Sequence, residues 1–405
     1  MKICAVICEY NPFHNGHKYL IERARELSGC DFILCLMSGS FTQRGEAAIL
    51  PKFTRAEHAI EGGADCVLQL PALFSVAPAE IFARGAISIL KAIPAVSCLA
   101  FGSENAAVND IVRAADILSG LNSEGAKKTD KTFTSNMGRG QSYKRSVALT
   151  MEELGAESRL ITSPNGILAV EYARAIKESG AHISLLPTER VGGGYGDGEL
   201  KENYSSASAI RKNISDIAIR DNVPECVYTA LTAKDRSGAE KEYDMLAMYA
   251  LLMADKSDMR RIFGCTEGLE NKLKASANLP LCRIIEEATS RRYTSSRIRR
   301  IIAANLLGLY SDDAIACIEQ GTYLKPLAVR ESCKDEIFAE LAKSRLPLIV
   351  KQRDLAKLSE GEKFGRSVPS APQERCYECD LKADFVRALI YGEEKEYEYT
   401  VKVIR

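Results

Sequence analysis

Two histidines three residues apart are the strongest candidates for chemistry in this sequence. They lie in the segment Cys8–His17, which reads CEYNPFHNGH and follows the apolar run Ile3–Cys8. If that run is the first strand of a parallel sheet and a helix starts at His17, the segment lies where such sheets bind anions. His14 and His17 could then donate hydrogen bonds to phosphate oxygens, and Gly16 would let the backbone come close. The spacing therefore predicts a phosphate-binding turn.

An ordinary turn with surface histidines is the alternative interpretation. It is disfavoured because the chain has only four histidines in 405 residues, and two of them meet at this one turn. A zinc site fits less well, since metallopeptidase histidines are four apart in a helix with a Glu between them. Cys376 and Cys379 form a lone CxxC pair without a second pair, so we name no metal ligands.

A second phosphate-binding element is predicted at Tyr204–Arg211, which reads YSSASAIR. Ser205 and Ser206 would open a helix, and their hydroxyls and the free amides, with Arg211 one turn later, suit a departing pyrophosphate. An ordinary serine N-cap is the alternative. The glycine-rich run Gly192–Gly198 before it matches neither a Walker A loop nor the dinucleotide fingerprint, and is interpreted as a lid or a plain linker.

The elements that must position these residues are given by four apolar runs. Ile3–Cys8, Phe32–Met37, Cys66–Leu70 and Val96–Phe101 show no alternation, which is typical of strands buried on both faces of a parallel sheet. They begin roughly 30 residues apart with helical patterns between them, the repeat of a βαβ unit. The fold class predicted is α/β, a doubly wound parallel sheet of Rossmann-like type. A fifth strand is expected at His182–Leu186.

Two domains are expected from the length and the change of pattern along the chain. Residues 1–220 would form the sheet domain, with a helical insertion at about 108–160, and residues 221–405 a mostly helical domain. Two strand-like runs within Tyr323–Val350 predict a small α/β portion in the second domain. The last residues alternate like an edge strand, and the segment 367–379 resembles a loop.

Composition excludes several classes of protein. The 54 Lys and Arg residues balance 54 Asp and Glu residues, so no global charge indicates a nucleic-acid or membrane partner. The first apolar run is too short for a signal peptide, and no stretch nears the roughly 18 residues that a membrane span needs. Thirteen scattered cysteines, several in apolar runs, fit a reducing compartment. We expect a cytoplasmic protein, and the sequence gives no oligomeric state.

A local basic cluster lies in the second half of the chain. The segment Arg283–Arg300 holds six Arg against two Glu, with Tyr293 among them. Such a helix could follow a phosphate backbone and stack on a base, although a solvated helix face is the alternative. The arginines of this candidate RNA-binding set are Arg283, Arg291, Arg292, Arg297, Arg299 and Arg300. A second cluster in the insertion comprises Lys127, Lys128, Lys131, Arg139, Lys144 and Arg145.

The sequence resembles that of a known family along nearly the whole chain. The segments ICEYNPFHNGHKYLI, MSGSFTQRGEAA, SVAPAEIFARGAISIL, LAFGSEN, SPNGILAVEYARAI and TERVGGG resemble the bacterial tRNA(Met) cytidine acetate ligases, members of the HxGH nucleotidyltransferase superfamily. The resemblance implies that His14 and His17 are catalytic. It also implies ATP contacts by Ile7, Glu9, Asn11, Phe13, His14, Asn15, Gly16, His17, Leu20, Gly102, Asn165, Arg190, Ser205 and Ser206.

The reaction implied by the resemblance has two steps. Acetate and ATP would give acetyl-AMP and pyrophosphate, and the N4 amine of the wobble cytidine of elongator tRNA(Met) would then take the acetyl group. Mg²⁺ on the phosphates is expected for this chemistry. Two alternatives stay open from the residues alone: a small-molecule adenylyltransferase, and a non-catalytic RNA-binding protein with a vestigial nucleotide site.

Overall fold

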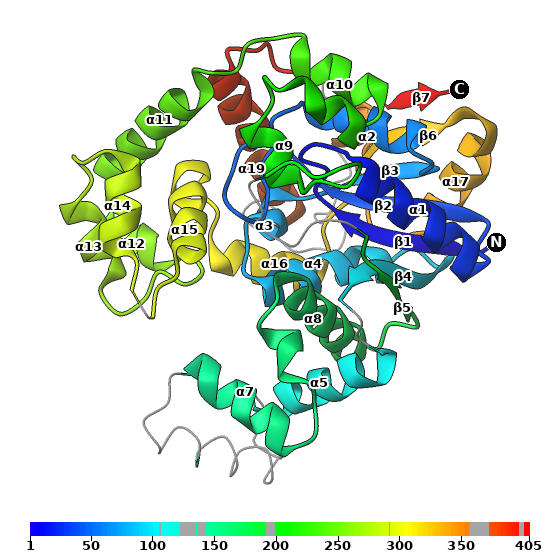
Figure 1. The fold of residues 1–405 in the computed structure, drawn as a ribbon, viewed down its shortest axis with the longest axis horizontal. Helices are drawn as coiled ribbons and strands as arrows, with labels where there is room; N and C mark the ends of the chain where they lie inside the picture. Colours follow the sequence, from blue (N-terminus) through cyan, green and yellow to red (C-terminus); the bar gives the residue numbers. More distant parts are fainter. Residues whose placement is uncertain are drawn as a thin grey trace, which may run out of the picture.

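The computed structural model describes residues 1–104, 107–121, 135, 143–191, 199–290, 292–355, 372–396 and 401–405. Within these residues the centre of the molecule is a seven-stranded sheet of order β5-β4-β1-β2-β3-β6-β7 (Figure 1). The first five strands are parallel, β6 runs antiparallel to β3, and β7 runs parallel to β6. The strands are β1 Ile3–Cys8, β2 Phe32–Ser38, β3 Cys66–Leu70, β4 Val96–Ser103, β5 Ser184–Glu189, β6 Pro326–Arg330 and β7 Lys402–Ile404. The predicted α/β class is confirmed.

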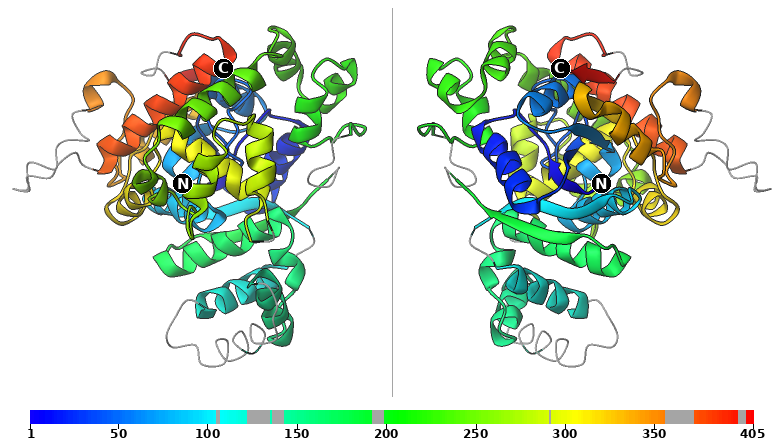
Figure 2. Two further views of the ribbon diagram at one scale, coloured as in Figure 1. Left: turned by 90° about the vertical axis from the view of Figure 1, so that its left-hand side faces the viewer. Right: turned by 90° about the vertical axis from the view of Figure 1, so that its right-hand side faces the viewer.

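Helices cover both faces of the sheet (Figure 2). In the first half of the chain they are α1 Asn15–Ser28, α2 Lys52–Glu61, α3 Ala72–Ser75, α4 Ala79–Lys91, α5 Val108–Leu121, α7 Tyr143–Glu153, the 3₁₀ helix η1 Ser158–Ile161, α8 Pro164–Ser179 and α9 Ala207–Lys212. In the second half they are η2 Ile217–Asn222, α10 Glu225–Thr232, α11 Ala239–Met253, α12 Lys256–Arg260, α13 Leu269–Ala275, α14 Leu281–Ala288, α15 Ser295–Leu307, α16 Ser311–Gln320, η3 Glu331–Cys333, α17 Lys334–Leu341, η4 Gln352–Leu355 and α19 Pro372–Tyr391.

Alternate residues of β1 enter two different cores, as the pleat of a strand requires. Ile3 and Ala5 pack with residues of α4 and α8, and Cys4 and Val6 pack with residues of α1 and α2. All four side chains are at most 1% exposed, which explains why the run is apolar without alternation. Burial on both faces fixes the carboxyl end of β1 and the turn that follows it.

The fifth strand is longer toward its carboxyl end than the apolar pattern predicts. It was expected at His182–Leu186 but runs from Ser184 to Glu189, in register with β4 as far as Ser103. Pro187, Thr188 and Glu189 carry no strand-like apolar signal, and backbone pairing with β4 decides their conformation. Gly102, expected just after the fourth strand, accordingly lies within β4.

The strands predicted for a separate small α/β portion are wrong in their placement. The run Pro326–Arg330 is β6 and pairs with β3 in the main sheet. Arg330 donates to Asp65 Oδ1 (3.3 Å) and to the carbonyls of Ile60 and Ala64, which precede β3. The other run makes only an isolated bridge between Leu324 and Leu348. The edge of β3 has unpaired backbone groups that bind β6, and the sequence pattern does not predict which strand will pair there. The terminal strand β7 lies at the sheet edge, as expected.

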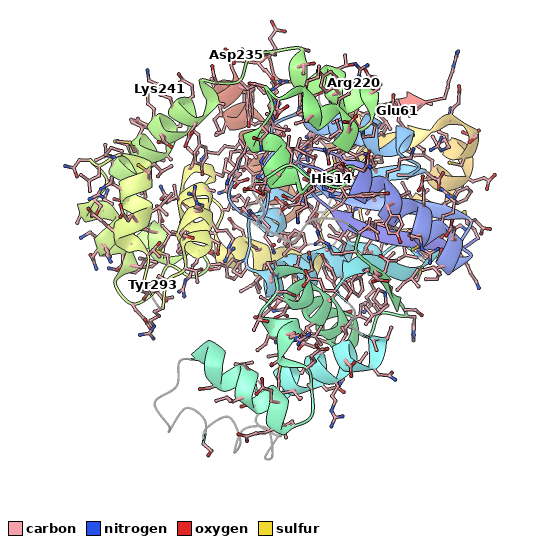
Figure 3. The ribbon with its side chains drawn as sticks, viewed as in Figure 1. His14, Glu61, Arg220, Asp235, Lys241 and Tyr293 are labelled. Atoms are coloured by element: carbon pink, nitrogen blue, oxygen red, sulfur yellow. The ribbon has the colours of Figure 1, made fainter. Side chains whose placement is uncertain are left out.

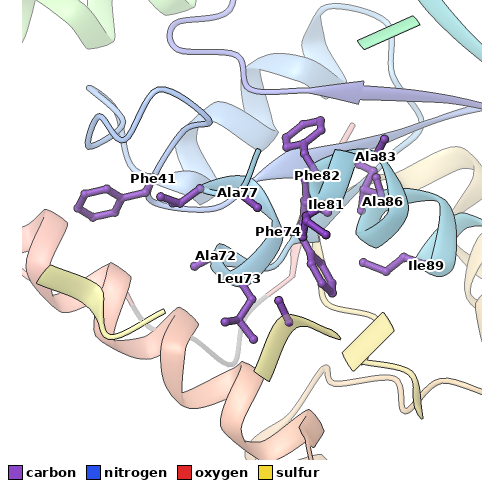
Figure 4. Close-up of a cluster of buried hydrophobic side chains, with 14 of the residues drawn as sticks. Phe41, Ala72, Leu73, Phe74, Ala77, Ile81, Phe82, Ala83, Ala86 and Ile89 are labelled. Atoms are coloured by element: carbon purple, nitrogen blue, oxygen red, sulfur yellow. The ribbon is translucent and has the colours of Figure 1, made fainter. Parts of the chain in front are cut away.

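The segment 367–379, interpreted as a loop from its sequence, is helical over its described part. Pro372–Tyr391 form α19, with Cys376 and Cys379 at most 1% exposed. One continuous core holds Leu73 and Phe74 of α3 with Tyr377 of α19, and Figure 4 shows the α3 and α4 side of that core. A Cβ on Gly85 would lie 2.2 Å from the Phe74 ring, so only glycine allows α4 to pack this closely. The helical half of the chain is thereby packed onto the sheet.

Of the predicted helical insertion, α5 lies against α8 and the edge strand β5, and α5 and α7 project from the sheet in Figure 1. The domain boundaries themselves stay a prediction. Among the described residues, no single helix has the length and hydropathy to cross a membrane; the pair α15 and α16, bent by 83°, meets those two criteria together, by length and composition alone.

Candidate functional site

A cavity of about 260 Å³ lies at the carboxyl ends of β1, β4 and β5. β1 lies between β4 and β2, so the strand order reverses beside it, and a doubly wound sheet binds its ligand at such a point. The predicted ATP-binding residues that line this cavity are Ile7, Glu9, Asn11, His14, Gly16, His17, Leu20, Gly102, Asn165, Arg190, Ser205 and Ser206. The structure therefore brings together residues that are up to about 200 positions apart in the chain.

His14 and His17 form a stacked pair at the start of α1. Their ring centroids lie 3.6 Å apart with an interplanar angle of 18°. The helix α1 begins at Asn15, two residues earlier than the predicted start at His17. His14 is its N-cap residue, and the His14 backbone amide donates to His17 Nδ1 (3.3 Å). That bond leaves the proton of a neutral His17 on Nε2, the nitrogen available to a ligand.

Both imidazoles are held in the neutral form. Burial, followed by the positive charge of Arg190, lowers the pKa of His14 to about 3. Burial and the neighbouring His14 lower the pKa of His17 well below its usual value. At neutral pH the pair therefore presents N–H donors to the cavity without positive charge. An arriving phosphate would meet donors that need no rearrangement.

The turn between β1 and α1 holds the pair by close contacts. Tyr10 has a φ of 48°, a left-handed conformation that is costly for a residue with a side chain. Its ring is 1% exposed and packs edge-on against His17 with centroids 4.8 Å apart. A Cβ on Gly16 would lie 3.0 Å from His14 Cε1, so glycine at this position leaves room for the ring.

The loop between β2 and α2 is bonded directly to that turn. Glu9 Oε1 accepts from the amide of Gln43 (2.6 Å), and Asn11 Oδ1 accepts from the amide of Ile49 (2.8 Å). Burial raises the pKa of Glu9. Glu9 thus fixes the position of Gln43, which also lines the cavity, and Asn11 fixes the same loop at Ile49.

Arg55 of α2 also connects the turn after β1 to the loop after β2. This role was not predicted from the sequence. Its side chain is 0% exposed, and burial lowers its pKa to about 10. The guanidinium donates to the carbonyls of Glu9 (2.6 Å), Ser38 (3.1 Å) and Gly39, and Nε donates to that of Leu50 (3.0 Å). A buried positive charge therefore lies behind the floor of the cavity.

Gly102 and Arg190 meet at the other wall. A Cβ on Gly102 would lie 2.9 Å from Arg190 Cγ, so the absence of a side chain lets the arginine cross the end of β4. The Arg190 amide donates to the carbonyl of Ser103 (3.3 Å), which continues the pairing of β5 with β4. Asn165 near the start of α8 donates from Nδ2 to Glu104 Oε1 (3.4 Å). All three residues face the cavity, and their ATP contacts stay predictions.

Two predicted ATP contacts do not line the cavity. Phe13 is 0% exposed and packs against Gly62, where an added Cβ would lie 2.3 Å from the ring. Asn15 donates from Nδ2 to the carbonyls of Asn203 (3.1 Å) and Asp221 (2.8 Å). Both therefore have packing or anchoring partners, and their roles toward ATP remain untested.

The predicted serine element has the structure of a helix cap. Ser206 is the N-cap of α9 and accepts from the Ala209 amide (3.1 Å). The Ser205 hydroxyl is bonded to the backbone of Lys201. Arg211, one turn later, donates to the carbonyl of Asn11 (2.7 Å) and to Glu46 Oε2 (2.7 Å). The element thus reaches the histidine turn through Arg211.

A second and wider cavity of about 1010 Å³, here called the groove, opens beside the first. It lies between α9 and α10 on one side and α11 and α15 on the other. Arg44, Glu46, Ser208 and Arg211 line both cavities. Of the predicted RNA-binding arginines, Arg299 lines the groove.

The other described arginines of that set do not gather on one surface. Arg283 pairs with Glu286 (2.8 Å) and Arg292 with Glu267, and all four side chains are exposed. Arg297 donates to the Gly264 carbonyl (2.9 Å) and lies over the ring of Tyr293, which Figure 3 shows far from His14. Arg300 lines a small cavity with residues of α3. Arg297 therefore has a structural role that its position in a basic run conceals.

Some predicted residues cannot be placed. The glycine-rich run Gly192–Gly198, Arg291, Lys127, Lys128, Lys131 and Arg139 lie outside the described residues, and the side chains of Lys144 and Arg145 are not described. Over the part of the chain that is described, no group of three or more His, Cys, Asp or Glu side chains could hold a metal ion.

Sequence reasoning missed several residues that line the first cavity. They include Gln43, Arg44, Glu46, Tyr172 and Thr188. Gln43, Arg44 and Glu46 lie in the segment TQRGEAA, which carries part of the family resemblance. The sequence of a loop does not indicate which of its side chains face inward. Tyr172 lies in the middle of α8, where its burial looks like ordinary packing.

Comparison with known proteins agrees with this geometry. Residues 1–401 match the family described as HIGH Nucleotidyl Transferase. The tRNA(Met) cytidine acetate ligase of Thermoanaerobacter sp. strain X514 is 32% identical over 363 residues, covering 87% of this chain and 89% of that protein. The same-named protein of Anoxybacillus flavithermus is 32% identical over 368 residues, covering 88% and 90%.

Two solved structures have the same fold. Thermotoga maritima TmcAL in its apo form has a TM-score of 0.87 and 27% identity, with both chains covered completely. The same protein bound with alpha-thio ATP has a TM-score of 0.81 and 27% identity, covering 98% of this chain and 97% of that one. The chain therefore belongs to the HIGH nucleotidyltransferases and, within them, to the family of tRNA(Met) cytidine acetate ligases.

Proposed function

We propose that this protein activates acetate with ATP and transfers the acetyl group to the N4 amine of the wobble cytidine of elongator tRNA(Met). The observation that carries the proposal is the neutral, stacked His14–His17 pair in a cavity at the switch point of the sheet. Supporting it, the relatives similar over most of the chain are named for this activity.

In the first step, a carboxylate oxygen of acetate attacks the α-phosphorus of ATP. The bond to the β-phosphate oxygen breaks, and pyrophosphate leaves with the electron pair. Negative charge grows on the oxygens around the α-phosphorus, and the His14 and His17 N–H groups would donate to them. No protein nucleophile is needed, so the rate would come from positioning and from charge stabilisation.

Positive charge around the cavity would hold the triphosphate. Arg190 approaches His14 closely enough to lower its pKa, and Arg211 donates to the carbonyl of Asn11 in the same turn. We assign the leaving pyrophosphate to Arg190 and to the start of α9. The buried charge of Arg55 adds a favourable potential from behind the turn.

Mg²⁺ would enter with the nucleotide. The carboxylate of Glu9 lines the cavity, and a Mg²⁺ ion commonly takes one or two carboxylates together with substrate phosphates. Glu9 fits such an ion, which would neutralise charge on the phosphates.

In the second step, the cytidine N4 attacks the acetyl carbonyl carbon of acetyl-AMP. The bond between that carbon and the phosphate oxygen breaks, AMP leaves, and one amine proton is lost as the amide forms. The tRNA would lie against the helical half of the chain, where we assign phosphate contacts to Arg283, Arg292 and Arg299.

A direct test is incubation of the purified protein with ATP, acetate and a tRNA(Met) transcript. We expect pyrophosphate rather than orthophosphate, and N4-acetylcytidine in the tRNA by nucleoside mass spectrometry. Pyrophosphate release with acetate but no acetylated tRNA would favour a small-molecule adenylyltransferase. Binding of tRNA without any pyrophosphate release would favour an RNA-binding protein with a vestigial nucleotide site.

A further inference from the structure

The groove meets the nucleotide cavity at a small set of side chains. Arg44, Glu46, Ser208 and Arg211 line both cavities, so we call them the junction. A reactant in the groove would reach the nucleotide cavity at these residues. Arg211 also donates to the carbonyl of Asn11, three residues before His14, which connects the junction to the histidine turn.

The loop that carries the junction is held in place from the groove side. The Tyr243 hydroxyl of α11 donates to the carbonyl of Gly45 (2.8 Å). Gly45 has a φ of +74°, and a Cβ there would lie 2.7 Å from the Arg299 carbonyl. Only glycine therefore lets this loop approach α15 so closely. The junction has a defined geometry rather than that of a free surface loop.

The chemistry of the junction fits one edge of a cytosine base. Glu46 Oε2 is an acceptor, and it lies 2.7 Å from Arg211 Nη2, which is a donor group. Cytosine offers the N4 amine as a donor next to N3 and O2 as acceptors. A carboxylate is the side chain that accepts from cytosine N4, and a guanidinium donates to the neighbouring acceptors.

The groove is better suited to bind one unstacked nucleotide than to follow the phosphate backbone of an RNA. Its lining has six basic and five acidic side chains, so its charge is nearly balanced. Half-buried tyrosines, including Tyr228 and Tyr391, form part of its walls. RNA-binding proteins commonly take single-stranded bases out of the stack onto aromatic side chains and read their Watson–Crick edge.

We propose that the groove binds the acceptor nucleotide of the RNA and that Glu46 and Arg211 hold the Watson–Crick edge of its cytosine at the junction. The inference rests on the proposed function and extends it by naming where the acceptor binds. The groove would receive a base flipped out of the anticodon loop, and its amine would point through the junction toward His14 and His17.

The first test separates the two half-reactions in groove variants. Ile217 is 73% exposed at the lip of the groove, so Ile217→Asp changes its charge without disturbing a core. We expect the KM for tRNA(Met) to rise at least five-fold in Ile217→Asp. In Glu46→Gln, we expect kcat/KM for acetyl transfer to fall at least ten-fold further than acetate-dependent ATP–pyrophosphate exchange, which needs no tRNA.

The matched control is Lys334→Glu on α17, a charge reversal on the opposite side of the molecule (Figure 1). It should leave both half-reactions as in wild type. Equal losses of exchange and transfer in Glu46→Gln, or an unchanged KM in Ile217→Asp, would overturn the groove assignment. A wild-type protein that exchanges pyrophosphate with acetate but acetylates no tRNA would instead refute the proposed function, and the groove inference with it.

A second test needs no variant. A tRNA(Met) transcript that keeps the wobble cytidine and carries 4-thiouridine at the preceding nucleotide is bound to the full-length protein, irradiated and digested. Crosslinks on peptides containing residues 44–47, 208–217 or 228–244 would support the inference. Crosslinks confined to the predicted insertion, about residues 108–160, or to residues 255–275 would overturn it.

Discussion

The nucleotide cavity and the helical half of the chain use charged side chains in opposite ways. Around the cavity, the side chains of Glu9 and Asn11 accept from backbone amides and the buried Arg55 donates to a backbone carbonyl, so these polar groups have fixed directions. In the helical half, Arg283 and Arg292 are exposed and pair with exposed glutamates. Transition-state charge at one phosphorus requires preorganised donors, whereas a flexible polynucleotide needs cations that can move to meet it.

The largest expected effect is loss of a donor in the cavity. In His17→Ala, acetate-dependent ATP–pyrophosphate exchange should fall about 10²-fold or more, the typical cost of one oxyanion donor. The fold should persist, because the ring faces the cavity and not a core. The control is His182→Ala, an exposed histidine on the way into β5. Normal exchange by a folded His17→Ala protein would refute the phosphate role.

Replacing the buried Arg55 should lower the free energy of unfolding more than replacing any exposed arginine. Arg55→Met would leave the carbonyls of Glu9, Ser38, Gly39 and Leu50 without this donor, and each unsatisfied buried group costs about 1–3 kcal/mol. We expect the free energy of unfolding to fall by about 3 kcal/mol or more. Arg283→Ala should change it by less than about 0.5 kcal/mol. Similar values in urea titrations of the two variants would contradict the contrast.

The buried histidines should make stability depend on pH. An unfolded imidazole has a pKa near 6.5, whereas that of folded His14 is about 3 and that of His17 lies well below the usual value. Below pH 6.5 the unfolded chain binds protons that the folded chain does not, so the free energy of unfolding falls as pH decreases.

Between pH 6.5 and 5, each histidine should contribute a loss of at most about 2 kcal/mol. Urea titrations of wild type and His17→Asn at pH 7, 6 and 5 measure this loss. Asp380, whose pKa burial raises to about 7, has the opposite dependence, but it is the same in both proteins. Equal slopes in the two proteins would show that His17 is not held neutral.

A smaller effect is expected at the wall of the cavity. Gly102→Ala places a methyl group 2.9 Å from Arg190 Cγ and should displace the arginine. We expect the KM for ATP to rise roughly ten-fold, the effect of about 1.4 kcal/mol. Gly238→Ala is the matched control, since nothing lies within 4 Å of its Cβ position. An unchanged KM would mean that Arg190 does not contact ATP.

The smallest effect is expected for a single exposed arginine of the helical half. Arg283→Ala should weaken tRNA binding slightly, with little change in exchange. The slope of log affinity against log salt should decrease by about one, as expected for one lost phosphate contact. Filter binding at several salt concentrations measures it, and an unchanged slope would remove Arg283 from the RNA-binding surface.

The central sheet and the histidine turn were predictable because local patterns encode them. Continuous apolar runs of five or six residues, spaced like βαβ units, indicate buried strands, and β1 and β3 have the predicted bounds. The strand bounds differ from the prediction where backbone pairing with a neighbouring strand outweighs the residue types. Pro187–Glu189 extend β5 because β4 offers partners, and Pro326–Arg330 join β3 from more than 250 residues away.

The RNA-binding set illustrates what a charge run cannot reveal. Arg297 and Arg299 are two residues apart in one helix, yet Arg297 is bonded to the Gly264 carbonyl and Arg299 lines the groove. A period of 3.6 residues turns such neighbours to different faces, and only the packing of α15 decides which face is open.

The sequence by itself determined the class of fold, the HxGH turn and the family, because each depends on local spacing and residue type. Only the tertiary structure decided that Arg55 lies beneath the turn, that Arg211 joins it to α9, and that the groove opens onto the same cavity. Those contacts join segments between about 40 and 200 residues apart. Their geometry follows from how the sheet and helices pack, which no local pattern in the sequence specifies.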